Sequence, residues 1–301
     1  MQRSFLMLLA LVLVATAAHG QRPAQPARNA SLPSVSPDGR GIAFGADRGE
    51  LVWQIYVVGA DGSGTLKLTD SKEDKHTPAW SADGKSVLFE AEHGDTTVLY
   101  AVPREGGAPR TIAALKAKSI VASPDGKRIA YTVGNWTRNR IVVSDLDGRG
   151  ATAITDSSAG YFNIAWSRDG GRIAVTRTDS THDLQVWVMD GDGGNARALT
   201  RFPKSDGRPQ WPAWSPDGKR IAIQSGTYSR EKPETSDAYI WVVDVASGRS
   251  TRLTTHERPR LDETPSWFQD GKRIAFQSDR TGRMEIWVMD ADGTHERQVT
   301  R

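Results

Sequence analysis

Short apolar runs recur along most of the chain, each bounded by polar and turn-forming residues. Every run has three residues, and alanine stands in the middle of five of the six. A run that is apolar on both faces is typical of a strand covered on both sides. The six runs are Ile42 to Phe44, Val87 to Phe89, Ile129 to Tyr131, Ile173 to Val175, Ile221 to Ile223 and Ile274 to Phe276.

A four-residue turn signal ending in Asp-Gly precedes each apolar run. Pro in the second place fits a type I turn, Asp bonds the local backbone, and Gly accepts a left-handed conformation. Each tetrad is therefore predicted to join two antiparallel strands. The tetrads are Ser36 to Gly39, Ser81 to Gly84, Ser123 to Gly126, Ser167 to Gly170, Ser215 to Gly218 and Phe268 to Gly271, and their aspartates lie 42 to 53 residues apart.

A third strand is predicted behind each apolar run, and a fourth in most repeats. The third lies at Ile55 to Val58, Leu99 to Val102, Ile141 to Val143, Val186 to Met189, Ile240 to Val243 and Ile286 to Met289. The fourth is short and is expected at Leu68-Thr69, Ile154-Thr155, Leu199-Thr200, Leu253-Thr254 and Val299-Thr300. No repeat shows an apolar stripe with the period of a helix.

Six repeats of four strands predict an all-β fold, a six-bladed β-propeller of four-stranded antiparallel blades. The propeller is expected to span residues 31–301, with blades at about 31–69, 76–113, 118–155, 161–200, 209–254 and 262–300. Repeats that are buried on both faces need a neighbour on each side, and a ring supplies one. Closure should rest on face packing between the first and last blades, unless residues 21–30 add a strand.

The first twenty residues differ from the rest and are interpreted as a signal peptide. Arg3 is followed by the apolar run Phe5 to Ala18, which is shorter than the roughly 20 residues of a membrane-spanning helix, and small residues follow it. An uncleaved anchor is the alternative. Residues 21–30 read as a flexible linker. The chain has no cysteine, so we expect an exported, periplasmic protein without disulfides or a lipid anchor on cysteine.

The repeat resembles that of the TolB propeller and its periplasmic relatives, a PD40 or WD40-like repeat family. The resemblance is carried by Ser215 to Ala222, Ile286 to Gly293 and Ser278 to Gly282, and it covers essentially all of the chain behind the leader. TolB itself has an α/β domain ahead of its propeller. Here only the linker is expected in that place, so the resemblance implies the propeller part alone.

Successive strands of a blade run in opposite directions, so alternate connections are predicted to lie on opposite faces of the ring. This strand parity predicts two unlike faces. The tight Asp-Gly turns fall on one face, and the longer segments fall on the other. Loops on a rigid scaffold often carry function, so the irregular face is the candidate binding face. Its longer segments are Glu90 to Thr97, Arg201 to Gln210, Ser225 to Asp237 and Thr255 to Asp262.

The central opening on that face should be rimmed by the first residues of the inner strands. These are Ser31, His76, Lys118, Phe162, Gln210 and Glu263, with Thr77, Asn163 and Trp211 one step inward. Such a mixed ring suits a small polar ligand, a saccharide or a peptide segment. The alternative is that these side chains only solvate the mouth of the channel. Trp211 is not explained by packing that repeats between blades, and neither are Trp53 and Trp136.

Several sharper chemical hypotheses are not supported. The formal net charge of +3 and the scattered basic residues disfavour nucleic-acid binding. The Asp-x-Asp-Gly segments at Asp145, Asp190 and Asp290 fit turns rather than calcium loops. His76, His93, His182, His256 and His295 lack metal-ligand spacing. No Gly-x-Ser-x-Gly elbow of a prolyl-oligopeptidase-type hydrolase occurs in the sequence.

We therefore expect a monomeric, exported, non-catalytic propeller that binds a protein partner or a ligand in the cell envelope, with no cofactor, metal or catalytic residue. The alternative is a propeller enzyme, a polysaccharide lyase or hydrolase, that uses the channel mouth. A structural subunit of a membrane complex is a third hypothesis, which the residues do not separate from the first.

Overall fold

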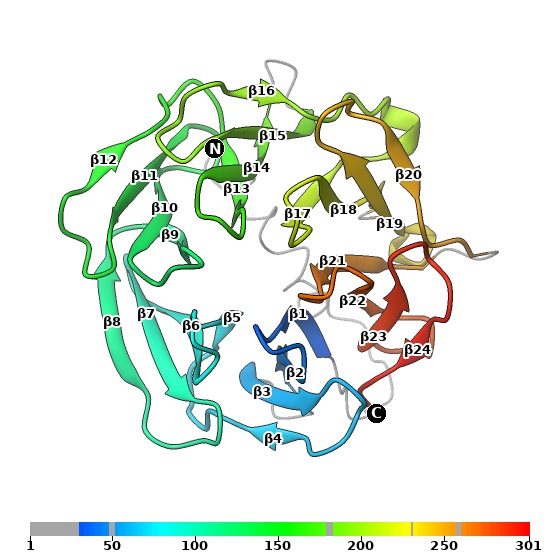
Figure 1. Ribbon diagram of the computed structural model, residues 1–301, viewed down its shortest axis with the longest axis horizontal. Coiled ribbons are helices and arrows are strands. Elements are labelled where there is room, and N and C mark those ends of the chain that lie inside the picture. Colours follow the sequence, from blue (N-terminus) through cyan, green and yellow to red (C-terminus); the bar gives the residue numbers. More distant parts are fainter. Residues whose placement is uncertain (1–29, 48–51, 179–182, 230, 257–259) are drawn as a thin grey trace.

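Six four-stranded sheets surround a central axis in the computed structural model, which describes residues 30–47, 52–178, 183–229, 231–256 and 260–301 (Figure 1). Each sheet consists of four strands that follow one another along the chain, and all the pairings are antiparallel. The predicted six-bladed propeller is thereby confirmed. Among the described residues, no helix is long and apolar enough to cross a membrane. The signal peptide, residues 21–29 of the linker, and His182 lie outside the described residues.

The first three blades occupy the N-terminal half of the chain. Blade 1 has β1 (Ala30–Val35), β2 (Gly41–Ala46), β3 (Gln54–Gly59) and β4 (Leu66–Lys67). Blade 2 has β5 (His76–Trp80), β6 (Ser86–His93), β7 (Thr96–Pro103) and β8 (Arg110–Leu115). Blade 3 has β9 (Lys118–Ala122), β10 (Arg128–Gly134), β11 (Asn139–Asp145) and β12 (Thr152–Ala153).

The other three blades follow the same order from the axis outward. Blade 4 has β13 (Tyr161–Trp166), β14 (Arg172–Thr178), β15 (Leu184–Asp190) and β16 (Arg197–Ala198). Blade 5 has β17 (Gln210–Trp214), β18 (Arg220–Thr227), β19 (Asp237–Asp244) and β20 (Ser250–Arg252). Blade 6 has β21 (Asp262–Trp267), β22 (Arg273–Ser278), β23 (Glu285–Asp290) and β24 (Arg297–Gln298). Two short 3-10 segments, η1 (Lys204–Asp206) and η2 (Pro233–Thr235), lie in blade 5 connections.

The Asp-Gly tetrads form the predicted turns between the first and second strands. The six tetrad glycines have φ between 66° and 69°, the left-handed conformation that glycine adopts at low cost. In the five repeats that begin with Ser, its hydroxyl donates to the tetrad Asp at 2.5–2.7 Å. These hydrogen bonds explain why Ser and Asp recur two positions apart.

The predicted fourth strands were placed two residues too late. The Leu-Thr and related pairs do not belong to the outer strands; they follow them directly. The threonine hydroxyl instead accepts a backbone N–H from within the third strand, as Thr200 does from Val186 at 2.9 Å. Thr69, Thr155, Thr254 and Thr300 do the same in other blades. A side chain here replaces one bond of the strand ladder, and the apolar pattern does not reveal that substitution.

The segment from Glu90 to Thr97, predicted to be irregular, is a tight hairpin between two long strands. β6 continues to His93, and β7 begins at Thr96. Gly94 supplies a φ of 65° at the turn, and the strand-favouring Thr-Thr-Val that follows allows the ladder to continue. Glu90 therefore lies within the sheet, paired with His76.

Neighbouring blades are joined by an arginine-tryptophan contact beneath the tetrads. The guanidinium of Arg172 lies 4.5 Å from the centroid of the Trp214 ring in the next blade and donates to the carbonyl of Gly218 at 2.9 Å. The indole of Trp214 donates back to the carbonyl of Ala165 at 3.2 Å. Arg128 with Trp166, and Arg220 with Trp267, repeat the cation-π contact. These contacts account for three of the tryptophans that directly precede the tetrads, namely Trp166, Trp214 and Trp267.

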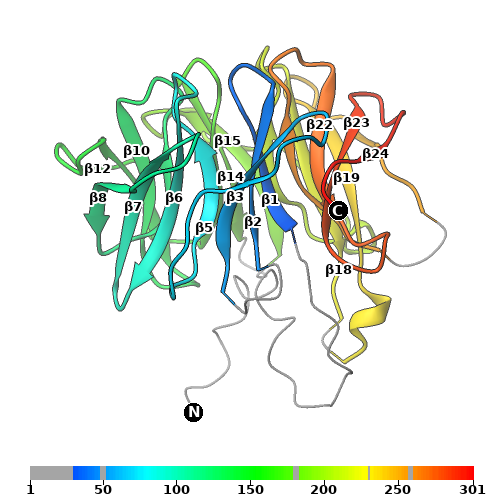
Figure 2. The same ribbon diagram turned by 90° about the horizontal axis from the view of Figure 1, so that it is seen from below.

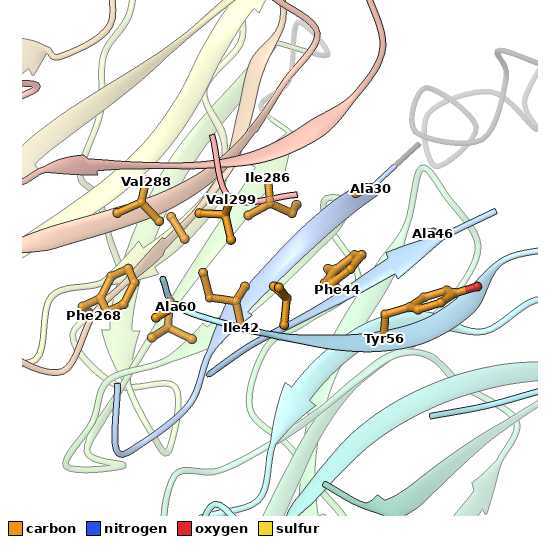
Figure 3. Close-up of a cluster of buried hydrophobic side chains, with 13 residues drawn as sticks. Ala30, Ile42, Phe44, Ala46, Tyr56, Ala60, Phe268, Ile286, Val288 and Val299 are labelled. Carbon is orange, nitrogen blue, oxygen red and sulfur yellow. The ribbon is translucent and has the colours of Figure 1, made fainter. Parts of the chain in front are cut away.

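The ring closes by packing between blade 6 and blade 1. Figure 3 shows side chains of the two blades meeting face to face, with Phe268, Ile286 and Val288 opposite Ile42 and Phe44. No strand among the described residues is shared between the two sheets. The backbone N–H of Ala30, the first residue of β1, donates across the junction to the carbonyl of Met284 at 2.8 Å. The linker was predicted to end at Ala30, but Ala30 is already the first residue of β1.

The two ends of the ring differ in the way that strand parity predicts. In the side view of Figure 2, the turn between β1 and β2 lies at the upper edge, and the yellow turn that contains η2 lies at the lower edge. The longer blade 5 connections, with η1 and η2, belong to this lower face. We call it the loop-rich face.

Candidate binding site at the centre of the ring

Every inner strand carries one residue in the left-handed conformation near its start. The six residues are Leu32, Thr77, Ser119, Asn163, Trp211 and Thr264, with φ between 49° and 55°. In each blade the register with the second strand shifts at this residue. Left-handed backbone is strained for residues other than glycine, above all for Thr, and such strain is often found at functional sites.

Glutamines on the second strands hold two of these strained residues in place. Gln277 accepts the N–H of Leu32 at 2.9 Å across the closing junction. Gln224 accepts the N–H of Thr264 at 2.8 Å from the next blade. Because these glutamines pair with the first rim residue of their own blade, each ties the rim of one blade to the rim of the next.

A cavity of about 470 Å³ occupies the centre of the ring, and all six inner strands contribute to its lining. Much of the wall is apolar, with Leu32 and the prolines Pro33, Pro78, Pro212 and Pro265. Trp53, Trp136 and Trp211 also line it, all partly exposed. The three tryptophans that repeated packing does not explain thus meet in one cavity, which reaches the loop-rich face through the connections that hold Trp53 and Trp136.

Several polar groups of the cavity lie in blades 1 to 4. Burial lowers the pKa of His76, which favours the neutral imidazole. The ammonium of Lys118 lies 2.7 Å from a carboxylate oxygen of Glu92 and joins the two blades. The side-chain oxygens Ser31 Oγ, Thr77 Oγ1 and Asn163 Oδ1 are buried. This side of the cavity can therefore orient a ligand through hydrogen bonds.

Glu90 is the least expected residue of the cavity. Its side chain is 7% exposed, its Oε1 has no hydrogen-bond partner among the described residues, and burial raises its pKa to about 8. Glu90 occupies the position of Gln224 and Gln277 in the other blades, since each pairs with the first rim residue of its own blade. The carboxyl is therefore largely protonated at neutral pH and resembles the amide of those glutamines.

A second cavity of about 370 Å³, the side pocket, lies beside the channel between blades 4, 5 and 6. It shares Asn163 and Trp211 with the central cavity. Phe162, Phe202 and Tyr228 supply further aromatic walls, and the lining also includes Lys204, Arg208, Gln210, Gln224 and Glu263. The η1 loop and the end of β18 build the pocket, because Gly207 packs its backbone directly against that of Gly226.

Glu263 is held in the side pocket by neutral donors. Tyr228 donates to its Oε1 at 2.7 Å, Gln277 donates to its Oε2 at 2.9 Å, and Gln224 approaches Oε1 at 3.4 Å. Burial raises the pKa of Glu263. Burial and the neighbouring carboxylate raise that of Tyr228 well above its ordinary value. The network fixes the wall of the pocket and ties blade 5 to blade 6.

The predicted rim residues are divided between the two cavities. Ser31, His76, Thr77 and Lys118 line the central cavity, whereas Phe162, Gln210 and Glu263 line the side pocket. The single predicted ring was therefore too simple, because the η1 loop opens a separate pocket beside blade 5. Sequence reasoning missed Glu90, Tyr228 and Arg208. Glu90 could have been found from the sequence, because it occupies the repeat position of Gln224 and Gln277. No sequence pattern marked Tyr228 or Arg208.

Metal ligands do not gather in the part of the chain that the structure describes: no three residues of the His, Cys, Asp and Glu types lie close enough to hold an ion there.

Known proteins show similarity over nearly the whole chain. Dipeptidyl-peptidase 5 of Porphyromonas gingivalis is 22% identical over 89% of this chain and 47% of its own length. The crystal structure of TolB from Acinetobacter baumannii superposes with a TM-score of 0.67 at 22% identity, covering 90% of this chain and 62% of that one. An oligogalacturonate lyase in complex with manganese superposes with a TM-score of 0.59 at 18% identity, over 91% and 78% of the chains.

The chain spans about half the length, or less, of the curated relatives that it matches. The structural similarities, all below 25% identity, bear on the fold alone. The family model of the TolB beta propeller domain matches residues 9–160 and 135–301. With the six repeats and the observed blades, this match shows that the chain belongs to the TolB beta propeller domain family.

Proposed function

We propose that this protein is an exported, non-catalytic binding propeller that presents its loop-rich face to a protein partner in the cell envelope. The observation that carries the proposal is the central cavity, whose wall combines three partly exposed tryptophans with four prolines. Partly exposed aromatic side chains that line a concave site are typical anchors of protein interfaces. A rigid ring that holds them in place also reduces the entropy lost on binding.

Export is proposed from the leader, with its apolar run Phe5 to Ala18 and the small residues behind it. The relation to TolB propellers supports a place in the envelope. Maturation is testable by N-terminal sequencing of the secreted chain, which should begin near Gln21. The binding face is independent of this step, because none of its residues belongs to the leader.

Replacing Trp211 with Asn should weaken partner binding by about tenfold or more. Asn tolerates the left-handed backbone at this position, and Asn163 already occupies the equivalent place in blade 4. The variant therefore removes the indole without adding strain. The measurement is the amount of partner retained from an envelope extract, compared between the wild type and Trp211→Asn at equal protein.

The control for this test is Lys127→Ala, which changes an exposed residue beside a tetrad turn at the opposite face. It should retain the same partners as the wild type. Equal retention by Trp211→Asn would contradict the proposed face, provided that its thermal unfolding matches that of the wild type.

A second candidate function is a saccharide-cleaving enzyme that uses the central cavity, and Glu90 is the observation that favours it. A carboxyl in the cavity lining with a pKa of about 8 lies in the range useful for proton transfer at neutral pH. Release of sugar fragments by the wild type but not by Glu90→Gln would support this function. Bound metal found by elemental analysis would also favour the enzyme. Failure to release fragments from any polysaccharide of a panel would favour the binding propeller.

A further inference from the structure

We propose that the side pocket between blades 4, 5 and 6 binds an acidic saccharide, a sugar unit that carries a carboxylate. This site is distinct from the central cavity, although the two share the wall formed by Asn163 and Trp211. The inference does not depend on the identity of a protein partner. The side pocket has a volume of about 370 Å³, which lies within the range of small-ligand sites.

Arg208 is the group that would select the carboxylate. Its side chain is exposed, lines the pocket, and has no ion-pair partner among the described residues. The other cation of the pocket, Lys204, is already paired with Asp183 at 3.3 Å. A guanidinium offers two parallel N–H donors that match a carboxylate, so an unpaired arginine at a pocket favours an anionic ligand of that geometry.

Hydrogen-bonding groups for hydroxyls line the same pocket. Asn163 Oδ1 is buried and has no hydrogen-bond partner in the described part of the chain, and the partly exposed Gln210 also lines the pocket. The two oxygens of Glu263 accept three hydrogen bonds, so one of about four lone-pair positions stays open for a hydroxyl. Buried polar groups are normally satisfied, and a ligand rich in hydroxyls would satisfy these.

The apolar part of the pocket suits the remaining face of a sugar. Trp211 is partly exposed and lines both cavities, so its ring is available to a ligand. One face of a sugar ring carries mainly C–H groups, which pack against an indole. Peptides are often recognised through a free strand edge or an apolar groove. The unpaired groups here are polar side chains in a small pocket, which favours a compact polar ligand.

The test is calorimetric titration of the purified protein with three matched pairs of sugars: glucuronate with glucose, galacturonate with galactose, and N-acetylmuramate with N-acetylglucosamine. We expect at least one acidic sugar to bind about tenfold more tightly than its neutral partner. Arg208→Gln should abolish that preference. Arg201→Gln, which removes an exposed arginine of the same connection that does not line the pocket, should keep it.

Three results would overturn the proposal. One is the absence of millimolar or tighter binding by any of the acidic sugars. Another is equal affinity for the acidic and neutral members of every pair. The last is an equal loss of preference in Arg201→Gln and Arg208→Gln, which would show a general effect of surface charge. Thermal unfolding of both variants establishes that each remains folded.

Discussion

Truncating Phe268 to Ala should lower the free energy of unfolding by about 3–5 kcal/mol, the usual cost of removing a buried phenylalanine. Phe268 is completely buried and belongs to the cluster that joins blade 6 to blade 1. The guanidinium of Arg273 lies 4.1 Å from the centroid of its ring. No described strand is shared between the two blades, so side-chain packing, with a few hydrogen bonds such as that from Ala30 to Met284, holds them together. Denaturant unfolding followed by tryptophan fluorescence measures the loss.

The matched control is Phe89→Ala, which removes an equally buried ring from the cluster between blades 1 and 2. Both variants should lose stability. Only Phe268→Ala should also expose the backbone amides of β1 and β23 to faster hydrogen exchange, because the ring opens at its junction. Equal exchange of β1 and β23 in the two variants would contradict closure by face packing.

Replacing Glu90 with Gln should remove a pH-dependent loss of stability that amounts to a few kcal/mol. The pKa of Glu90 is about 8 in the folded protein, against an ordinary value of 4.5. Below pH 4.5 the carboxyl is protonated in both states, and its contribution is fully present. As the pH rises towards 8, the unfolded chain ionises first, so the folded state loses relative stability.

The measurement is the free energy of unfolding of wild type and Glu90→Gln at pH 5, 6, 7 and 8. The free energy of unfolding of Glu90→Gln should rise steadily relative to that of the wild type from pH 5 to pH 8. Glu92→Gln, at an exposed position two residues along the same strand, should show a much smaller trend. A difference between wild type and Glu90→Gln that is the same at pH 5 and pH 8 would contradict the buried, protonated carboxyl.

The fold was predictable because its signal repeats. Six tetrads each require a glycine at positive φ, and the structure has one at every predicted position. Errors arose where a side chain replaced a backbone partner, as Thr200 does for Val186. They also arose where a tight turn at Gly94 replaced the expected loop. Such local hydrogen-bonding choices leave no trace in the apolar periodicity.

The candidate site was predictable only in outline. Strand parity predicted His76, Lys118 and Trp211 at a single channel mouth. In the structure the first two line the central cavity, and Trp211 lies where the two cavities meet. The division into two cavities depends on the path of the η1 loop, and on the close approach of Gly207 to Gly226. The path of a loop cannot be predicted from its sequence when the loop has no periodic pattern. The protonated state of Glu90 likewise follows from burial by the next blade, which is a tertiary effect.

The central claim is that the loop-rich face, around the channel, is the face that binds a partner. The most direct test is photocrosslinking in intact cells, with benzoylphenylalanine placed at Trp136 on the loop-rich face or at Lys127 beside a tetrad turn. The proposal predicts a specific crosslinked envelope protein from position 136 and none from position 127. Crosslinks from position 127 alone, or equal crosslinks from both positions, would contradict it.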